Sequence, residues 1–370
     1  MFDEVIVMKT AEHFGFKLRE RKGAVAVIVA LAMTVFLGIA AMAVDVGHIM
    51  VVKNELHNAA DADALARANL LYAHTPSGFT SATPPTPDWA AAESAASTID
   101  PANKSDGVTL TSYEVETGYW NLDQNPAGLQ PKSITPGTRD VAAVKVTVRR
   151  VDGTNGGSIR HWFGAFVGNL TSNASATAIA ICSSPGTAKP GTLVPMAIPL
   201  WIAKRASHYN SPSNLLTIGS AYHYDAYAPV NPDGDPYTNT VAGQWTSLTS
   251  DPINNANHLK DIIVNGNSNP LSIGDPLYIE PGTMDVGYHD NYMGLYEGQT
   301  VFLPVVDAVL RDAVKQNPAP PIEAFIGFHI TKVSSGKEKY IRGYFVENAY
   351  LGGGPGGPYY GAWVPPVLVY

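Results

Sequence analysis

The hydrophobic pattern of the chain is dominated by one uninterrupted apolar segment near its start. Residues Ala24–Val44 are 21 consecutive positions without a charged side chain. A helix of this length extends about 31 Å at ~1.5 Å per residue, which matches the ~30 Å hydrocarbon core of a bilayer. Gly38 lies inside the segment, and glycine is well tolerated in membrane helices. The pattern therefore predicts one transmembrane helix.

Basic residues lie on one side of this segment. Lys17, Arg19, Arg21 and Lys22 precede it, whereas the first basic residue after it is Lys53. Cytoplasmic flanks of membrane helices carry the excess of lysine and arginine. We therefore expect residues 1–23 in the cytoplasm and a single-pass anchor at 24–44 in the inner (cytoplasmic) membrane. The body that follows would be periplasmic or extracellular.

Two other interpretations of the apolar segment are open. Ala41-Met42-Ala43 fits the small-x-small site of a cleaved signal peptide, although the run is longer than the about 7–15 apolar residues usual there. A buried core helix is disfavoured because so uniformly apolar a helix is not normally flanked by a basic cluster. A retained anchor is the favoured interpretation.

A helical pattern continues beyond the membrane segment. Between His48 and Ala73 the sequence contains neither proline nor glycine, and its apolar and polar positions fall on opposite sides of a helix. Asp63 and Arg67 interrupt the apolar side, but their i,i+4 spacing allows them to pair. We expect residues 45–73 to extend the membrane helix outside. The apolar face, rich in alanine, either packs on the chain's own domain or receives a helix of a partner protein.

The rest of the pattern predicts an α+β protein, in which the long N-terminal transmembrane helix is followed by a mostly β exported body. A linker is expected at 74–88, a first β-rich subdomain at 89–184, and a second one with long insertions at 185–370. Short helices are expected at Trp89–Ile99 and near Arg160–Val167, and a flexible loop at Gly352–Pro358. The expected strands are Val108–Trp120, Val141–Val148, Ala174–Cys182, Leu215–Ser220, Pro276–Glu280, Thr300–Val306, Ala324–Val333 and Tyr340–Val346.

The net charge and the cysteine content limit the classes of function that the chain can have. The formal net charge is −8, and the residues after Lys22 hold 19 basic against 28 acidic side chains, a net of −9. An acidic body argues against nucleic acid as a partner and is typical of a domain behind a basic membrane flank. The one cysteine, Cys182, ends an apolar run, so we expect a buried, inert thiol and no intramolecular disulfide.

Candidate chemistry is sparse along the sequence. The run Asn231–Asn239 alternates oxygen-bearing residues as calcium loops do, with Asp233, Asp235 and Asn239 as the possible ligands. An EF-hand loop needs glycine at its sixth position and a bidentate glutamate at its twelfth, where this chain has Pro236 and Ala242. A polar turn without a cofactor is therefore the favoured interpretation. No phosphate-binding or nucleophile-elbow motif occurs, and we expect no enzymatic activity. Tyrosine clusters, including Tyr359-Tyr360, are explained by packing or by an exposed adhesive face.

Three stretches resemble the N-terminal region of TadG-like (TadE/TadG-type) proteins of Flp, or tight-adherence, pilus assembly. They are Arg21-Lys-Gly-Ala-Val-Ala-Val27, Ala43-Val-Asp-Val-Gly47 and Leu56-His-Asn-Ala-Ala-Asp-Ala-Asp-Ala-Leu-Ala66. The match is specific because of its order: a basic residue and glycine before the membrane, Asp-x-Gly after it, then a helix rich in alanine and aspartate. The anchor residues on which the match rests are Arg21, Lys22, Gly23, Asp45 and Gly47.

The resemblance implies an envelope-anchored accessory or minor-subunit protein of pilus assembly, which contacts envelope or pilus-assembly proteins through its N-terminal helix. Some members of the family carry a von Willebrand A-type domain, whose metal site begins with Asp-x-Ser-x-Ser; that run does not occur in this sequence. Type IV prepilins carry a glutamate five residues after the cleavage glycine, where this chain has Ile28. The alternative function is a surface adhesin or glycan-binding module on a membrane anchor.

Overall fold

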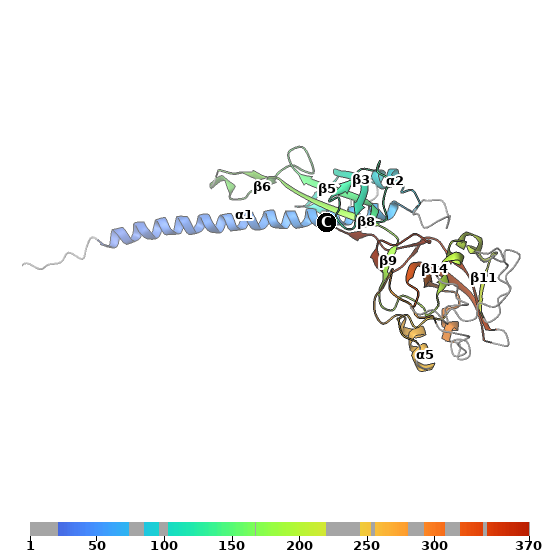
Figure 1. Ribbon diagram of the computed structural model, residues 1–370. Coiled ribbons are helices and arrows are strands. Elements are labelled where there is room, and N and C mark those ends of the chain that lie inside the picture. The colour runs from blue at the N-terminus through green and yellow to red at the C-terminus, as the bar shows by residue number, and fades with distance from the viewer. Residues whose placement is uncertain are drawn as a thin grey trace, which may run out of the picture.

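The computed structural model describes residues 21–73, 85–95, 103–166, 168–219, 245–252, 256–279, 292–307, 319–335 and 339–369. Its longest element is a single helix, α1 (Arg21–Leu70), of 50 residues. Figure 1 shows the first half of α1 projecting from the body as a free rod, while the second half lies against a sheet. The long N-terminal helix followed by a mostly β body is confirmed.

The two halves of α1 differ in burial because they face different surroundings. The large apolar side chains between Val25 and Val44 are all exposed. From Val52 onward one face of the helix is buried, through a stripe of small and apolar residues: Val52, Leu56, Ala59, Ala60, Ala64, Ala68 and Leu71. This stripe packs on the chain's own sheet, against strands β5 and β8. Of the two expectations for the outer half, packing on its own domain is therefore the one observed.

The first sheet is antiparallel and has the strand order β19-β8-β5-β3-β4. Its central strands carry alanine and β-branched residues, and those that face α1 share a core with the outer half of the helix. Small residues on both surfaces let the helix approach the sheet closely. The bounds are β3 (Tyr113–Asn121), β4 (Leu129–Gln130), β5 (Asp140–Arg150), β8 (Ala174–Cys182) and β19 (Val367–Leu368).

Shorter elements surround this sheet. Helix α2 (Trp89–Ser94) is capped by Asp88, which accepts a hydrogen bond from the amide of Ala91. The region near Arg160 was expected to be helical, but it forms a strand pair, β6 (Ile159–Arg160) with β7 (Thr171–Ser172), that encloses one 3-10 turn, η2 (Gly164–Phe166). Expected strand Val108–Trp120 is divided into β2 (Val108–Thr109), which pairs with β1 (Lys104–Ser105), and β3.

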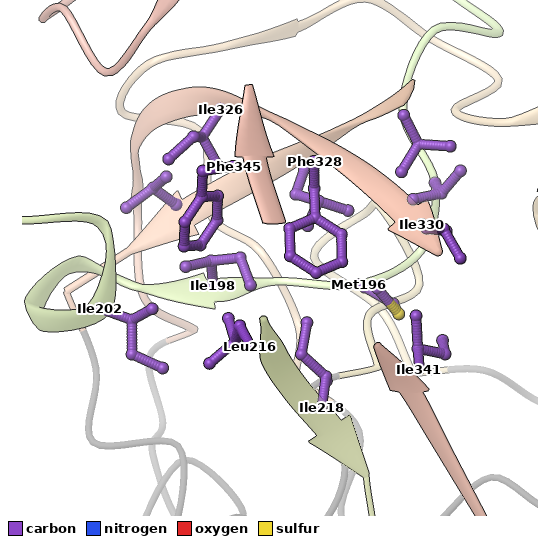
Figure 2. Packing of buried hydrophobic residues seen from close by; sticks show 14 of the residues in the cluster. Met196, Ile198, Ile202, Leu216, Ile218, Ile326, Phe328, Ile330, Ile341 and Phe345 are labelled. Atoms are coloured by element: carbon purple, nitrogen blue, oxygen red, sulfur yellow. The ribbon is translucent and has the colours of Figure 1, made fainter. Parts of the chain in front are cut away.

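The second sheet has the order β10-β13-β14-β15-β11, and only its β10–β13 pair is parallel. Figure 2 shows its core, where Phe328 and Phe345 meet edge to face with 5.3 Å between ring centroids. A Cβ atom at Gly343 would lie 2.1 Å from the carbonyl oxygen of His329, so only glycine fits there. The bounds are β10 (Ile198–Pro199), β11 (Leu216–Gly219), β13 (Thr300–Val306), β14 (Ile322–Ser335) and β15 (Lys339–Val346).

Small elements complete the second part of the body. Expected strand Pro276–Glu280 forms only isolated bridges among its described residues, Ile279 with Thr246 and Pro276 with Pro321. The helical elements are α4 (Leu200–Ala203), η3 (Ala206–Tyr209), α5 (Ala256–Asn265) and η4 (Tyr292–Tyr296), and the short strands are β9 (Pro185–Ala188), β12 (Leu271–Ser272), β16 (Ala349–Tyr350), β17 (Gly353–Pro355) and β18 (Ala362–Trp363).

The C-terminal segment returns to the first sheet. The glycine-rich run expected as a flexible loop contains β17, which pairs with β9, and β19 then adds to the edge of β8. Between them, Trp363 stacks on Tyr72 at the end of α1, with 4.1 Å between ring centroids, and lies 4.7 Å from Tyr359. The end of α1 is thus packed against residues nearly 300 positions later in the chain. The subdomain boundary at 184/185 stays a prediction.

Candidate functional site at the membrane-proximal junction

The residues singled out by sequence lie at the two ends of the apolar half of α1. The helix begins at Arg21, and Gly23 is exposed with open space around its Cα. Asp45 follows 22 residues later, about 33 Å further along at ~1.5 Å per residue. The side chains of Arg21 and Lys22, and the calcium candidates Asp233, Asp235 and Asn239, lie outside the described residues. Of the two ends, the structure therefore describes the side-chain contacts of the outer one, around Asp45 and Gly47.

Asp45 fastens a distant loop to the helix. Its carboxylate accepts a hydrogen bond from the backbone amide of Trp162 at 2.8 Å and from that of Phe163 at 3.1 and 3.2 Å. The residue is 6% exposed, although it directly follows a helical segment whose large apolar side chains are exposed. Hydrogen bonds from amides to a carboxylate are stronger than neutral ones, so this contact gives the aspartate of the Asp-x-Gly motif a structural task. Gly47 has open space around it, and nothing in the structure explains the glycine.

Two further residues of α1 hold neighbouring loops just beyond Asp45. The ring of His48 stacks on that of Trp162, with centroids 5.2 Å apart, and its Nε2 lies 3.1 Å from a carboxylate oxygen of Asp106. Two turns of helix further on, and on the same side, Glu55 accepts a hydrogen bond from the backbone amide of Asp106 at 2.7 Å. The helix between Asp45 and Glu55 is thus tied to two loops of the body. Sequence reasoning missed these partners, because they are more than 50 positions away.

The loop held by Asp45 is the end of the β6–β7 hairpin, and it has a defined shape. The amide of His161 donates to the carbonyl of Leu170 at 2.9 Å, and that of Asn169 to the carbonyl of Gly164 at 3.0 Å. The His161 ring contacts the carbonyl oxygen of Asn169 at 2.9 Å and the hydroxyl of Ser172 at 2.8 Å. A Cβ atom at Gly164 would lie 1.9 Å from the Asn169 carbonyl oxygen, so the turn requires glycine.

Further out on α1, a buried ion pair fixes the helix to the body. Arg67 donates to the Asp63 carboxylate at 2.7 Å, and both side chains are completely buried. The guanidinium also donates to the carbonyl oxygens of Ala92 and Glu93, each at 3.1 Å, at the end of α2. The expected i,i+4 pairing is confirmed. Its second role, joining α1 to α2, could not be inferred from spacing.

The cysteine and the C-terminal tyrosine pair singled out in the sequence are buried in the body. Cys182 is buried at the end of β8, and burial raises the pKa of its thiol to about 12, as expected of an inert thiol. Tyr359 and Tyr360 are 4% exposed each, so they pack and form no adhesive face; burial raises the pKa of Tyr359 to about 12. Among the described residues, no group of three or more His, Cys, Asp or Glu side chains could hold a metal ion.

The length, composition and burial of α1 define the class of protein. In the described part of the chain, α1 is the one helix long and apolar enough to cross a membrane, and its most apolar window is entirely unburied. The chain is thus a protein with one N-terminal membrane helix, whose outer half belongs to the core of an antiparallel β body.

Two family models match the chain. Residues 23–68 match a family described as putative Flp pilus-assembly TadE/G-like, and residues 78–180 match one described as putative Tad-like Flp pilus-assembly. The first covers most of α1, and the second covers α2 and most of the first sheet. No curated protein and no solved structure matches the chain. The chain is therefore TadG-like, similar to the TadE/G-type proteins of Flp pilus assembly over residues 23–68 and 78–180.

Proposed function

We propose that this chain is a membrane-anchored accessory or minor-subunit protein of Flp-type pilus assembly, which scaffolds other envelope or pilus-assembly proteins through the membrane half of α1. The observation that supports the proposal is the unequal burial of the helix. Its outer half is occupied by the body, whereas the large apolar side chains from Val25 to Val44 are exposed on every side. Helices of partner proteins would therefore find free surface on α1 chiefly within the membrane, where close packing drives association.

The proposal includes a retained anchor with its N-terminus in the cytoplasm. Helix α1 runs without interruption through Ala41-Met42-Ala43 into the part that packs on the sheet. Cleavage after Ala43 would remove the membrane half and leave Asp45 as the second residue of the new chain. Mass spectrometry of the protein extracted from membranes tests this point: retention predicts a species that still contains residues 1–43, and a species that begins at Val44 would contradict it.

Site-specific photo-crosslinking in cells tests the scaffold role. A photoreactive amino acid at Phe36, which is 70% exposed in the membrane half, should capture pilus-assembly membrane proteins. The same amino acid at Asn58, on the exposed polar face of the outer half, serves as the matched control and should capture far less. Recovery of no envelope or pilus protein from Phe36 would count against the scaffold.

Deletion of the protein, followed by imaging of pili, separates the scaffold from the adhesin. Loss or shortening of pili supports a role in assembly. Normal pili with lost surface attachment would contradict it and favour an adhesive body. The non-catalytic nature of the protein is part of the same proposal, supported by the assembly role of its family. The calcium candidates Asp233, Asp235 and Asn239 stay a prediction.

A further inference from the structure

The tip of the β6–β7 hairpin exposes large apolar side chains beside α1, close to Asp45. Trp162 is 69% exposed and Leu170 63%, and Phe163 beside them is 38% exposed. These residues belong to the loop whose backbone amides, at Trp162 and Phe163, donate hydrogen bonds to the Asp45 carboxylate. In Figure 1 the hairpin leaves the sheet and runs back along α1 toward its free half. An apolar tip is therefore held beside the helix at the end of the membrane segment.

Along the axis of α1, the tip lies at the position where the hydrocarbon core of the membrane is expected to end. Asp45 directly follows Val44, the last residue of the uncharged run. The headgroup layer on each side of a bilayer is about 5–8 Å thick, as the difference between its ~40–45 Å total and its ~30 Å core. At ~1.5 Å per residue this layer covers about three to five residues after Val44. Asp45 falls within that layer, His48 lies at its outer limit, and Lys53 lies beyond it. Both Asp45 and His48 contact Trp162.

The chemistry of the hairpin suits this position. Tryptophan is enriched at membrane–water interfaces, where its apolar ring and its N–H group meet different surroundings. Residues 153–173 contain no Asp or Glu, but they carry Arg160 and His161, in a body whose net charge is −9. A basic, non-acidic tip on an acidic body is complementary to the phosphates of lipid headgroups. The burial of Asp45 beneath the tip also shields its carboxylate from the lipid.

We propose that the β6–β7 hairpin tip, with Trp162, Phe163 and Leu170, inserts into the headgroup layer of the membrane, and that Asp45 is the positioning residue that holds it there. The body would then have a second contact with the bilayer besides α1, which fixes its height above the membrane and its tilt. The proposal rests on the transmembrane anchor alone and does not depend on the role in pilus assembly. A single helix can tilt in the bilayer, and a second contact at the headgroup layer restrains that tilt.

A nitroxide depth measurement tests the proposal on the full chain in nanodiscs of phosphatidylethanolamine and phosphatidylglycerol. Cys182 is 2% exposed and should stay unlabelled, so single cysteines can be introduced without removing it. Three matched leucines are replaced by labelled cysteine: Leu170 at the tip, Leu37 in the membrane segment, 70% exposed, and Leu295 in the second part of the body, 59% exposed. The readout is the ratio of the relaxation enhancement by oxygen, which enters lipid, to that by a water-soluble nickel chelate.

The proposal predicts a several-fold higher ratio at Leu170→Cys than at Leu295→Cys, with Leu37→Cys higher still. Equal ratios at Leu170→Cys and Leu295→Cys, with a high ratio at Leu37→Cys, would overturn the proposal and leave the tip facing water or a protein partner. A low ratio at Leu37→Cys would refute the anchor itself. Adding Asp45→Ala to Leu170→Cys should lower the ratio toward that of Leu295→Cys; an unchanged ratio would refute the positioning role of Asp45.

Discussion

The buried ion pair on α1 gives the sharpest prediction on stability. Arg67 is completely buried, pairs with Asp63 at 2.7 Å and donates to the carbonyl oxygens of Ala92 and Glu93. Arg67→Met keeps a long apolar stem but removes the charge and the donors. The substitution leaves the Asp63 carboxylate buried without its cation and two carbonyl groups without this donor. We therefore expect α2 to pack less stably against the outer half of α1.

The expected loss follows from what remains buried. Removing one partner of a buried ion pair costs ~3–5 kcal/mol, because the other charge stays in a low-dielectric interior. The double variant Asp63→Leu/Arg67→Met removes both charges, so it should be at least ~1 kcal/mol more stable than Arg67→Met alone. Arg149→Met is the matched control, because Arg149 and its partner Glu114 are 52% and 56% exposed. An exposed pair of this kind contributes about 0–1 kcal/mol.

Hydrogen exchange of the full chain in nanodiscs measures the effect where it occurs. A loss of ~3–5 kcal/mol raises the exchange rate of protected amides by about two to four orders of magnitude, at ~1.4 kcal/mol per factor of ten. Peptides from α2 and from β3, which packs against it, should show this increase in Arg67→Met. Equal exchange in Arg67→Met and Arg149→Met would refute the reasoning, as would a double variant that exchanges faster than Arg67→Met.

Three further predictions concern the hairpin, the aromatic stack and alkaline pH. Gly164→Ala should distort the hairpin and speed hydrogen exchange at residues 159–172, because its Cβ would lie 1.9 Å from the Asn169 carbonyl oxygen; wild-type exchange would contradict this. Trp363→Ala should lower the free energy of unfolding by ~3–5 kcal/mol in urea titrations, because the ring is 1% exposed and stacked; a loss below ~1 kcal/mol would contradict it. Burial raises the pKa of Cys182 from 9.0 to about 12, so its contribution to stability is complete below pH 9 and is lost as the pH rises toward 12. Urea titrations between pH 8 and pH 11 should therefore show falling stability, with a shallower slope in Cys182→Ala; equal slopes would contradict this assignment.

The elements that the sequence predicted well are those with a long, regular local pattern. The uncharged run and the alanine-rich stripe identified α1, because its apolar face repeats over many turns. Strand β8 was predicted at Ala174–Cys182 and β13 at Thr300–Val306, and both have these bounds in the structure. Their β-branched and small apolar residues lie between turn-forming segments, so local preference and burial agree.

What the sequence could not predict depends on contacts between distant residues. Strand β17 consists of glycine and proline, which favour turns, and it exists because β9 lies close enough to pair with it. The backbone at Arg160 was expected to be helical, but pairing with Thr171 makes it a strand. Asp45 was identified as part of a motif, whereas its partners Trp162 and Phe163 lie more than 115 positions away. Likewise, the sequence did not decide whether the outer half of α1 packs on its own domain or on a partner, because the sheet that covers it is formed by residues far away in the chain.

Cysteine accessibility along α1 in spheroplasts tests the central claim, that one retained helix crosses the membrane and carries the body outside. A membrane-impermeant maleimide should label Asn58→Cys in intact spheroplasts, leave Leu37→Cys unlabelled, and label Glu12→Cys only after permeabilisation. Cys182 gives no background because it is buried. Labelling of Glu12→Cys in intact spheroplasts, together with protection of Asn58→Cys until permeabilisation, would contradict the orientation and with it the account of this protein.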